Sequence, residues 1–293
     1  MRRYPERMQE PSIEMRRRLA AWRVTPAGAP ELTPSSELMR GSREGLPVMV
    51  KIALVDEEVR GAALLQWWGG RGAAPVLARD ERAILMERAT GTRDLAALAG
   101  SGQDAAATEI LVRTTLALHD HPAPTVRDGV QLVSLRDWFR DLLATDSDDP
   151  LLQRAAELAD RLLSTTTTDD VVVLHGDIHH GNVLDFGDRW AVIDPKGLIG
   201  HRAFDFANIL CNPTETTALD NLAARLHAIS RQAGIAPVML AEWTIAWCGL
   251  SLAWAPGEAI PSWHARTARA VAELLWESLN AGKKSSGTFS IEA

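Results

Sequence analysis

The segment that most constrains this chain begins at Val171, where four apolar residues lead into a dense polar loop. The run 171–174 has the composition of a short buried strand, and the loop after it contains Asp177 and, five positions later, Asn182. A second carboxylate, Asp194, ends the next apolar run. Phosphoryl transfer from ATP needs such a set, because one carboxylate orients the attacking hydroxyl and takes its proton while amide and carboxylate oxygens hold Mg²⁺. The segment therefore predicts the active site of a kinase.

A lysine upstream fits the same chemistry. Lys51 lies in the run 48–54, which is dense in β-branched and apolar residues and predicts a strand. A helix is expected over 56–67, because three acidic residues suit its first turn, and a second strand is expected at 83–87. A strand lysine followed by an acidic helix is how protein kinases hold the phosphates of ATP, and the Asp-x4-Asn spacing also matches their catalytic loop.

The rest of the pattern is mostly helical, with a hairpin expected at 183–185 and 190–193. We therefore predict an α+β, bilobal chain with a small β-rich N-lobe and a larger, mostly helical C-lobe. Helices are expected at 104–119, 134–143, 151–163, 203–211, 216–233, 237–254 and 264–279. The predicted parts are a flexible lead-in (1–18), the N-lobe (19–87), a hinge (88–93), the C-lobe (94–281) and a flexible tail (282–293).

Composition limits the classes of partner. The 293 residues contain 31 Lys+Arg and 38 Asp+Glu, a formal net charge of −7. Such a chain is poorly suited to nucleic acid or an anionic membrane and better suited to a cationic ligand, and no apolar run reaches the roughly 18 residues that a membrane span needs. The charged N-terminus lacks the apolar core of an export signal, which favours a cytoplasmic location. The only cysteines, Cys211 and Cys248, offer no disulfide framework, and we expect both to be buried.

Several motifs together resemble a known family. These are His175-Gly176-Asp177-x-His179-x-x-Asn182, Ile193-Asp194-Pro195, and the blocks at 184–188, 194–200 and 204–209. On these motifs the chain resembles the aminoglycoside/hydroxyurea antibiotic resistance kinases, and most of all the members that phosphorylate the 6-hydroxyl of streptomycin. The resemblance covers the chain from about Leu32 to Ala272. It implies a protein-kinase-like fold, with ATP and Mg²⁺ as cofactors.

The resemblance also implies a role for each matching residue. Asp177 is the expected catalytic base, and Asn182 and Asp194 are the expected Mg²⁺ ligands. Lys51 is expected to hold the α- and β-phosphates, in an ion pair with Glu58 or its neighbour Glu57; the spacing leaves both open. The other expected nucleotide contacts are Ser35 and Ser36, which either donate to phosphates in place of a glycine-rich loop or only form a turn, and a hinge for adenine at Met86, Glu87 and Ala89.

By the same resemblance the acceptor is streptomycin, a small cationic aminoglycoside, and the reacting group is the 6-hydroxyl of its streptidine ring. Carboxylates bind guanidinium groups through paired hydrogen bonds, but Glu242, Glu258 and Asp220 are not distinguished as partners. Two alternatives stay open: a kinase of another small hydroxylated or hydroxyurea-like compound, and a nucleotide-binding regulator without transfer activity. The oligomeric state and the choice between ATP and GTP are also open.

Other polar residues near the motifs have two interpretations each. Three histidines lie at 175, 179 and 180, yet no further ligand has the spacing of a zinc site, so we expect His175 to pack beneath the loop and hold Asp177. Asp205 is expected to brace the loop by accepting backbone N–H groups instead of binding substrate. Lys196 either approaches the transferred phosphate or is exposed. Three tryptophans at helical spacing are expected in the core instead of in a sugar-stacking wall: Trp243, Trp247 and Trp254.

Overall fold

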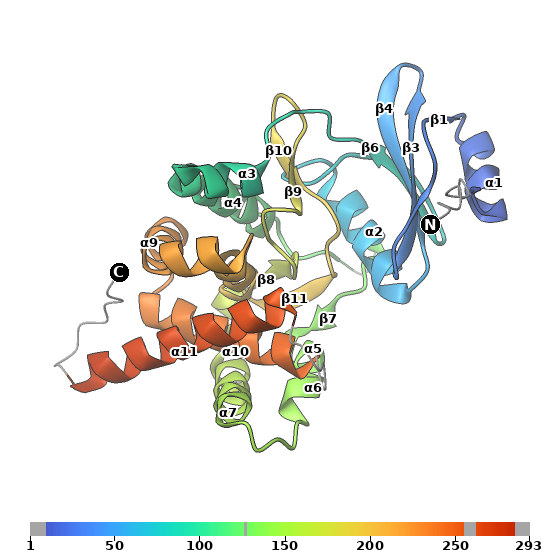
Figure 1. The fold of residues 1–293 in the computed structure, drawn as a ribbon. Helices are drawn as coiled ribbons and strands as arrows, with labels where there is room; N and C mark the ends of the chain where they lie inside the picture. Colours follow the sequence, from blue (N-terminus) through green and yellow to red (C-terminus); the bar gives the residue numbers. More distant parts are fainter. Residues whose placement is uncertain (1–9, 126–127, 255–261, 285–293) are drawn as a thin grey trace, which may run out of the picture.

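The computed structural model describes residues 10–125, 128–254 and 262–284. Within them a small lobe built on a β-sheet lies beside a larger lobe of helices (Figure 1). The α+β, bilobal architecture expected from the sequence is confirmed. The N-lobe spans the elements up to β6, and the C-lobe begins with α3.

The N-lobe sheet is antiparallel, with the strand order β1-β3-β4-β6-β5, and β2 also pairs with β3. Its strands are β1 (Thr25–Pro26), β2 (Glu31–Leu32), β3 (Ser36–Arg43), β4 (Leu46–Ala53), β5 (Val76–Asp80) and β6 (Ala83–Glu87). The sequence predicted β4 and β6 but not β3 and β5. These two contain many polar residues, because part of each lies at the surface.

Helices cover both faces of this sheet. Helix α1 (Ile13–Ala21) packs on one face through the fully buried Met15, and Ser12 caps it by accepting the Met15 N–H at 3.0 Å. Helix α2 (Asp56–Trp68) covers the opposite face, where Leu64 and Trp68 are buried. Residues 13–18 therefore belong to a helix instead of the flexible lead-in expected there, because the Ser12 cap and the buried Met15 and Leu19 hold it on the sheet. Residues 1–9 lie outside the described part.

The C-lobe is built around α10 (Pro237–Ala253), which packs against α7, α8 and α11. Trp243 in α10 is fully buried beside Phe139 and Phe204. The other helices are α3 (Leu95–Leu98), α4 (Asp104–His119), α5 (Leu135–Trp138), α6 (Arg140–Leu143), α7 (Pro150–Thr165), α8 (Phe204–Ala207), α9 (Glu215–Ala233) and α11 (Trp263–Lys284), with short helical turns η1 (Ala99–Gln103), η3 (Thr168–Asp170) and η4 (Asn208–Cys211). The flexible tail expected from residue 282 overlaps the end of α11, and residues 285–293 lie outside the described part.

Short strands in the C-lobe position the predicted active site. Strand β11 (Leu198–His201) lies between β8 (Val171–Leu174), to which it is antiparallel, and β7 (Val133–Ser134), to which it is parallel. Strands β9 (Val183–Asp185) and β10 (Trp190–Val192) form the expected hairpin. The polar loop joins β8 to β9, and the segment with the second carboxylate joins β10 to β11. Because β8 and β11 are antiparallel, the last residue of β8 lies opposite the first residue of β11. The polar loop and the segment with the second carboxylate therefore lie at the same end of this sheet.

The tryptophans and cysteines largely follow the expectation. Trp243 is buried and Trp247 half-buried, but Trp254 is 46% exposed, and its Nε1 donates to Asp141 Oδ2 at 3.0 Å, so core packing was wrong for Trp254. Cys211 and Cys248 are buried, with their Sγ atoms 3.6 Å apart.

In the described part no single helix is long and apolar enough to cross a membrane. Helices α9 and α10 reach that length only together, and they are bent by 117° relative to each other.

Candidate active site

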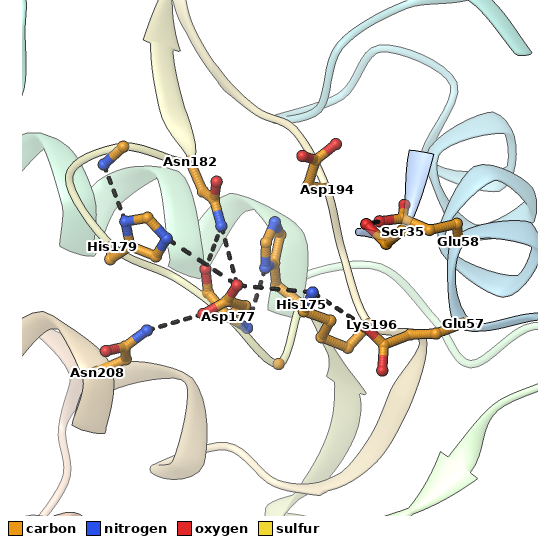
Figure 2. Close-up of polar contacts among 12 residues, drawn as sticks. Ser35, Glu57, Glu58, His175, Asp177, His179, Asn182, Asp194, Lys196 and Asn208 are labelled. Carbon is orange, nitrogen blue, oxygen red and sulfur yellow. Dashed lines mark hydrogen bonds and ion pairs between the residues drawn. The ribbon is translucent and has the colours of Figure 1, made fainter. Parts of the chain in front are cut away.

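A buried histidine anchors the loop between β8 and β9, the catalytic loop (175–182), from beneath. His175 is fully buried; its Nε2 lies 2.8 Å from the carbonyl oxygen of Ile193, and its Nδ1 accepts the backbone N–H of Asp177 at 3.2 Å. Burial lowers the pKa of His175, and these two contacts suit a neutral ring with its proton on Nε2. The ring thus fixes the backbone of Asp177 (Figure 2).

Asp205 in α8 provides a second brace. Its carboxylate accepts the backbone N–H groups of His175 at 2.9 Å and Gly176 at 2.7 Å, and His119 Nε2 lies 2.9 Å from it. Gly176 has a φ of 86°, and a Cβ there would lie 2.7 Å from the side chain of Leu198, so this turn requires glycine. Asp205 therefore supports the loop, and its carboxylate is already occupied.

The two carboxylate oxygens of Asp177 have different surroundings. Oδ1 accepts a hydrogen bond from Asn208 Nδ2 at 2.9 Å. Oδ2 accepts a weaker one from Asn182 Nδ2 at 3.2 Å, and it lies 3.8 Å from Lys196 Nζ and 4.0 Å from His179 Nε2 (Figure 2). The side chain of Asp177 is 29% exposed. One oxygen is therefore held by the protein, and the other remains among polar groups that a hydroxyl can join.

Lys196, which the sequence left either near the transferred phosphate or exposed, lies beside Asp177. Its Nζ is 3.0 Å from Glu57 Oε1, which links the C-lobe to helix α2. Burial lowers the pKa of Lys196, but the carboxylates of Asp177 and Glu57 more than offset this effect, so the net shift of the pKa is upward. Lys196 is therefore a cation at neutral pH, and it faces Asp177.

The predicted phosphate-holding lysine lies across the cleft. Nζ of Lys51 is 2.5 Å from Glu58 Oε2 and 2.8 Å from Asp194 Oδ1. Glu58 also accepts a hydrogen bond from Ser35 Oγ at 2.7 Å, so the structure decides the open choice of ion-pair partner in favour of Glu58. Asp194 has a φ of 58°, a left-handed conformation that costs a residue with a side chain about 1–2 kcal/mol. Such strain at a polar segment is typical of functional sites.

Comparison with known proteins identifies the family behind this geometry. A profile of the aminoglycoside/hydroxyurea antibiotic resistance kinases matches residues 21–258, well over half of the chain. The chain belongs to this family of resistance kinases. A streptomycin 3''-kinase from Klebsiella pneumoniae is 42% identical to this resistance kinase over 245 residues, which cover 81% of this chain and 90% of that protein.

Solved structures show the same fold. An aminoglycoside phosphotransferase APH(4)-Ia in a ternary complex with ADP and hygromycin B aligns with a TM-score of 0.62 at 14% identity, covering 95% of the resistance kinase and 100% of that chain. An ethanolamine kinase from Plasmodium vivax aligns with a TM-score of 0.57 at 12% identity, covering 86% and 82%. The protein-kinase-like fold is therefore confirmed.

The expected metal ligands of the resistance kinase fit a magnesium ion. Asn182 and Asp194 supply amide and carboxylate oxygens, which are the hard donors that Mg²⁺ prefers. Asn182 Nδ2 donates to the backbone carbonyl of Asp177 at 2.9 Å, so its amide oxygen points away from Asp177 (Figure 2). Asp194 is 35% exposed, which leaves room for a ligand beside its ion pair with Lys51.

A cavity lies against the face of the N-lobe sheet that carries Lys51. Leu38 pairs with Lys51 and Arg40 with Met49 across the ladder of β3 and β4, so these side chains share the face that carries Lys51. That face borders a cavity of about 230 Å³. Its lining residues are Ala27, Gly28, Ala29, Glu31, Leu38, Arg40 and Met49. The sequence analysis missed Leu38 and Met49, although the period-2 alternation around Lys51 could have indicated Met49.

The predicted adenine hinge starts beside this cavity. Met86 is buried and pairs with Met49 across β4 and β6. The backbone N–H of Glu87 donates to Pro75 at 2.9 Å, and its side chain pairs with Arg189 at 2.9 Å. The backbone N–H of Arg88 donates to the Pro47 carbonyl at 3.0 Å. The expected adenine contact, which stays a prediction, would therefore use the N–H of Ala89 or a later residue of the connector.

The two serines have separate surroundings. Ser35 faces Glu58, whereas Ser36 is 1% exposed, and its N–H donates to Thr33 Oγ1 at 2.9 Å. Thr33 in turn donates its own N–H to the carbonyl of Ser36 at 2.9 Å. For Ser36 the structure favours the turn over a phosphate contact, which stays a prediction for Ser35.

The histidines of the loop have separate contacts. His179 Nδ1 accepts the N–H of Gly181 at 3.0 Å. His180 is 2% exposed, its ring nitrogens have no hydrogen-bond partner among the described residues, and burial lowers its pKa to about 3. In the described ranges no group of three or more His, Cys, Asp or Glu side chains has the arrangement of a metal site.

The acidic residues considered for the acceptor are not brought together. Glu242 pairs with Arg161 at 2.7 Å between α10 and α7, Asp220 is exposed on α9, and Glu258 lies outside the described residues.

A residue that the sequence analysis missed is His264 in the first turn of α11. Burial lowers its pKa, and the charges of His179 and Asp177 also act on it, so α11 begins near the catalytic loop.

Proposed function

We propose that this resistance kinase is an ATP-dependent phosphotransferase that phosphorylates a hydroxyl group of streptomycin. The observation that carries the proposal is the arrangement of four side chains, on two adjoining segments of the C-lobe and on strand β4. Asn182 donates to Asp177 at 3.2 Å within the catalytic loop. Asp194, on the segment hydrogen-bonded to that loop, accepts a hydrogen bond from Lys51 at 2.8 Å. Streptomycin as acceptor is supported by the 42% identical streptomycin 3''-kinase. The net charge of −7 also suits a cationic acceptor.

In the proposed reaction, Oδ2 of Asp177 accepts the proton of the acceptor hydroxyl. A bond forms between the hydroxyl oxygen and the γ-phosphorus, and the bond from that phosphorus to the β–γ bridging oxygen breaks, which releases ADP. Lys51, held by Glu58, binds the α- and β-phosphates. Asn182 and Asp194 would hold Mg²⁺, which would neutralise phosphate charge. Lys196, 3.8 Å from Asp177 Oδ2, stabilises the charge of the transferred group.

Two hydroxyl groups of streptomycin are candidates for the acceptor. The motifs of the catalytic loop and of residues 194–209 support the 6-hydroxyl of the streptidine ring, which we propose as the primary site. The name of the Klebsiella pneumoniae relative supports the 3''-hydroxyl, on the terminal sugar, as a second candidate. The two hydroxyls lie on different rings, so the phosphorylated product distinguishes them directly.

The test is the structure of the product. The purified protein is incubated with ATP, Mg²⁺ and streptomycin, and the product is examined by mass spectrometry and by ³¹P–¹H correlation NMR. Phosphate on the streptidine ring supports the primary site, and phosphate on the terminal sugar supports the second candidate. Recovery of unmodified streptomycin would contradict the proposal and redirect the search to other hydroxylated or hydroxyurea-like acceptors.

The proposal includes a cellular location. The cosubstrate ATP is supplied in the cytoplasm, so we place the enzyme there. Fractionation of expressing cells tests this point: activity in the soluble cytoplasmic fraction supports it, and activity in the periplasmic fraction contradicts it.

A further inference from the structure

An amide pair lies behind the base of the proposed reaction. Asn208, the first residue of η4, is 5% exposed, and its Nδ2 donates to Asp177 Oδ1 at 2.9 Å. Asn212 Nδ2 donates to Asn208 Oδ1 at 2.7 Å and to the Asn208 carbonyl at 3.1 Å. Asn212 is 8% exposed. The two side chains thus form a buried relay that ends on the carboxylate of Asp177.

The relay fixes which way the amide of Asn208 faces. If this amide turned over, its oxygen would face the Asp177 carboxylate and its NH₂ would face the NH₂ of Asn212. Both contacts would be repulsive, and a buried unpaired polar group is costly. With Asn212 in place, Asn208 can therefore only donate to Asp177.

A buried arginine holds the backbone of the relay. Arg225 in α9 is 1% exposed; its Nη1 donates to the carbonyl of Ile209 at 2.8 Å and also to the carbonyl of Asn212. Its guanidinium forms an ion pair with Asp104 at 2.5 Å. The turn that carries both amides is therefore anchored to α9 and to the start of α4, elements remote in sequence from the catalytic loop.

We propose that Asn208 is a positioning residue for the phosphoryl transfer, and that Asn212 acts only through it. By binding Oδ1, Asn208 fixes the side-chain rotation of Asp177, so that Oδ2 faces Asn182 and the acceptor. This inference rests on the proposed function of Asp177. It adds a buried group that acts on the orientation of the base.

The test is the kinetics of Asn208→Leu, which keeps the approximate volume of the side chain and removes the donor. Because a hydrogen bond to a charged group is lost, we expect kcat to fall about 10- to 100-fold, with the KM for ATP and for acceptor and the Kd for ADP within about twofold of wild type. The matched control is Asn221→Leu on α9, whose amide donates only to the Thr217 carbonyl at 2.9 Å, and its kcat should not change. If Asn208→Leu does not fold, Asn208→Ser, too short to reach Asp177, has the same expected loss.

A second variant tests the relay. Asn212→Leu leaves the donor in place but frees its orientation, so its kcat should fall less than that of Asn208→Leu. The double variant should have the kcat of Asn208→Leu alone, because Asn212 has no other route to the reaction. Three results would each overturn the proposal. The first is a double variant in which the two losses of kcat multiply, and the second is an unchanged kcat in Asn208→Leu. The third is a change of KM and kcat together with a lower Tm.

The outcome is separable from that of the proposed function. If the wild type does not phosphorylate streptomycin, the proposed function fails, and the variants are then compared by the slow hydrolysis of ATP by water. In that assay, a kcat of Asn208→Leu about 10- to 100-fold below that of wild type supports the positioning role on its own. A ratio near one overturns it.

Discussion

At the scale of single residues, two adjacent carboxylates on α2 have different partners. Glu58 pairs with Lys51 in the N-lobe, whereas Glu57 pairs with Lys196 in the C-lobe. Consecutive residues of a helix point about 100° apart, so neighbours in sequence need not share a site. The sequence contained both acids and both lysines, but the pairing depends on the angle at which α2 packs.

This difference predicts that two matched substitutions change the KM for ATP by different amounts. Glu58→Gln weakens the hold on Lys51, so the KM for ATP should rise about tenfold or more. Glu57→Gln leaves Lys51 paired, so its KM for ATP should stay within about twofold of wild type. Steady-state kinetics with varied ATP measures both. A KM for ATP of Glu58→Gln within about twofold of wild type would show that the ion pair of Lys51 does not support nucleotide binding.

The catalytic loop shows how far residue-level prediction reaches. That Asp177 and Asn182 lie close together could be predicted, because five positions of one short loop limit the distance between them. Asn208 and Asn212 could not, because they reach Asp177 only through the packing of η4. Asn208 lay inside a motif quoted for the family resemblance, yet nothing in its spacing indicated the carboxylate as its partner.

At the scale of elements, α2 approaches the Asp194 segment without a side chain between them. A Cβ on Gly61 would lie 2.2 Å from the carbonyl oxygen of Pro195. On the same side of the helix, Glu58 holds Lys51, and Lys51 in turn pairs with Asp194 at 2.8 Å. The contact therefore couples the helix of the N-lobe to the predicted metal ligand of the C-lobe.

Gly61→Ala should force α2 away from this segment. We expect kcat/KM to fall at least about tenfold, because the ion pair between Lys51 and Asp194 and the position of Asp194 both depend on the contact. The control is Gly100→Ala, where an added Cβ would meet nothing within 4 Å and activity should be unchanged. Wild-type kinetics for Gly61→Ala would mean that the helix can shift without affecting the site.

Elements with a clear periodicity were predicted well. Strands β4, β6 and β8 and helices α4, α9 and α10 lie within a few residues of their expected positions, because their apolar residues follow the strand or helix period. Strand β3 was missed because Glu37, Arg40 and Arg43 interrupt its apolar residues, and the ladder with β4 compensates for this composition.

At the scale of the whole molecule, the connector between the lobes is fastened to the hairpin β9–β10. Arg93 donates to Asp185 at 2.8 and 2.7 Å, and Glu87 pairs with Arg189 at 2.9 Å. A Cβ on Gly91 would lie 2.0 Å from the carboxyl carbon of Asp185, so the chain passes directly over this group. These contacts fix both ends of the connector, whose role as a hinge over residues 88–93 stays a prediction.

The fastening predicts a pH-dependent stability. The hydrogen bonds from Arg93 hold the pKa of the Asp185 carboxyl well below its usual range. A carboxyl whose pKa is depressed in the folded state stabilises the fold above its unfolded-state pKa of about 3.9, and the stabilisation is lost as the pH falls below that value. Arg93→Gln should therefore be less stable than wild type at pH 7, and the difference should shrink below about pH 4.

Urea unfolding at several pH values measures this difference. The control is Arg113→Gln, which removes an exposed ion pair with Glu109 on α4 and should cost little at any pH. A constant difference between Arg93→Gln and wild type across the pH range would contradict the assignment to Asp185.

The central claim is that Asp177 catalyses transfer of a phosphoryl group from ATP to streptomycin. The measurement that tests it most directly is ADP release from ATP and Mg²⁺ with and without streptomycin, for wild type and Asp177→Asn. We predict release that depends on streptomycin in the wild type and falls about 10²- to 10⁴-fold in the variant, because a general base contributes about that much. Release without dependence on streptomycin, or an Asp177→Asn variant as fast as wild type, would contradict the claim.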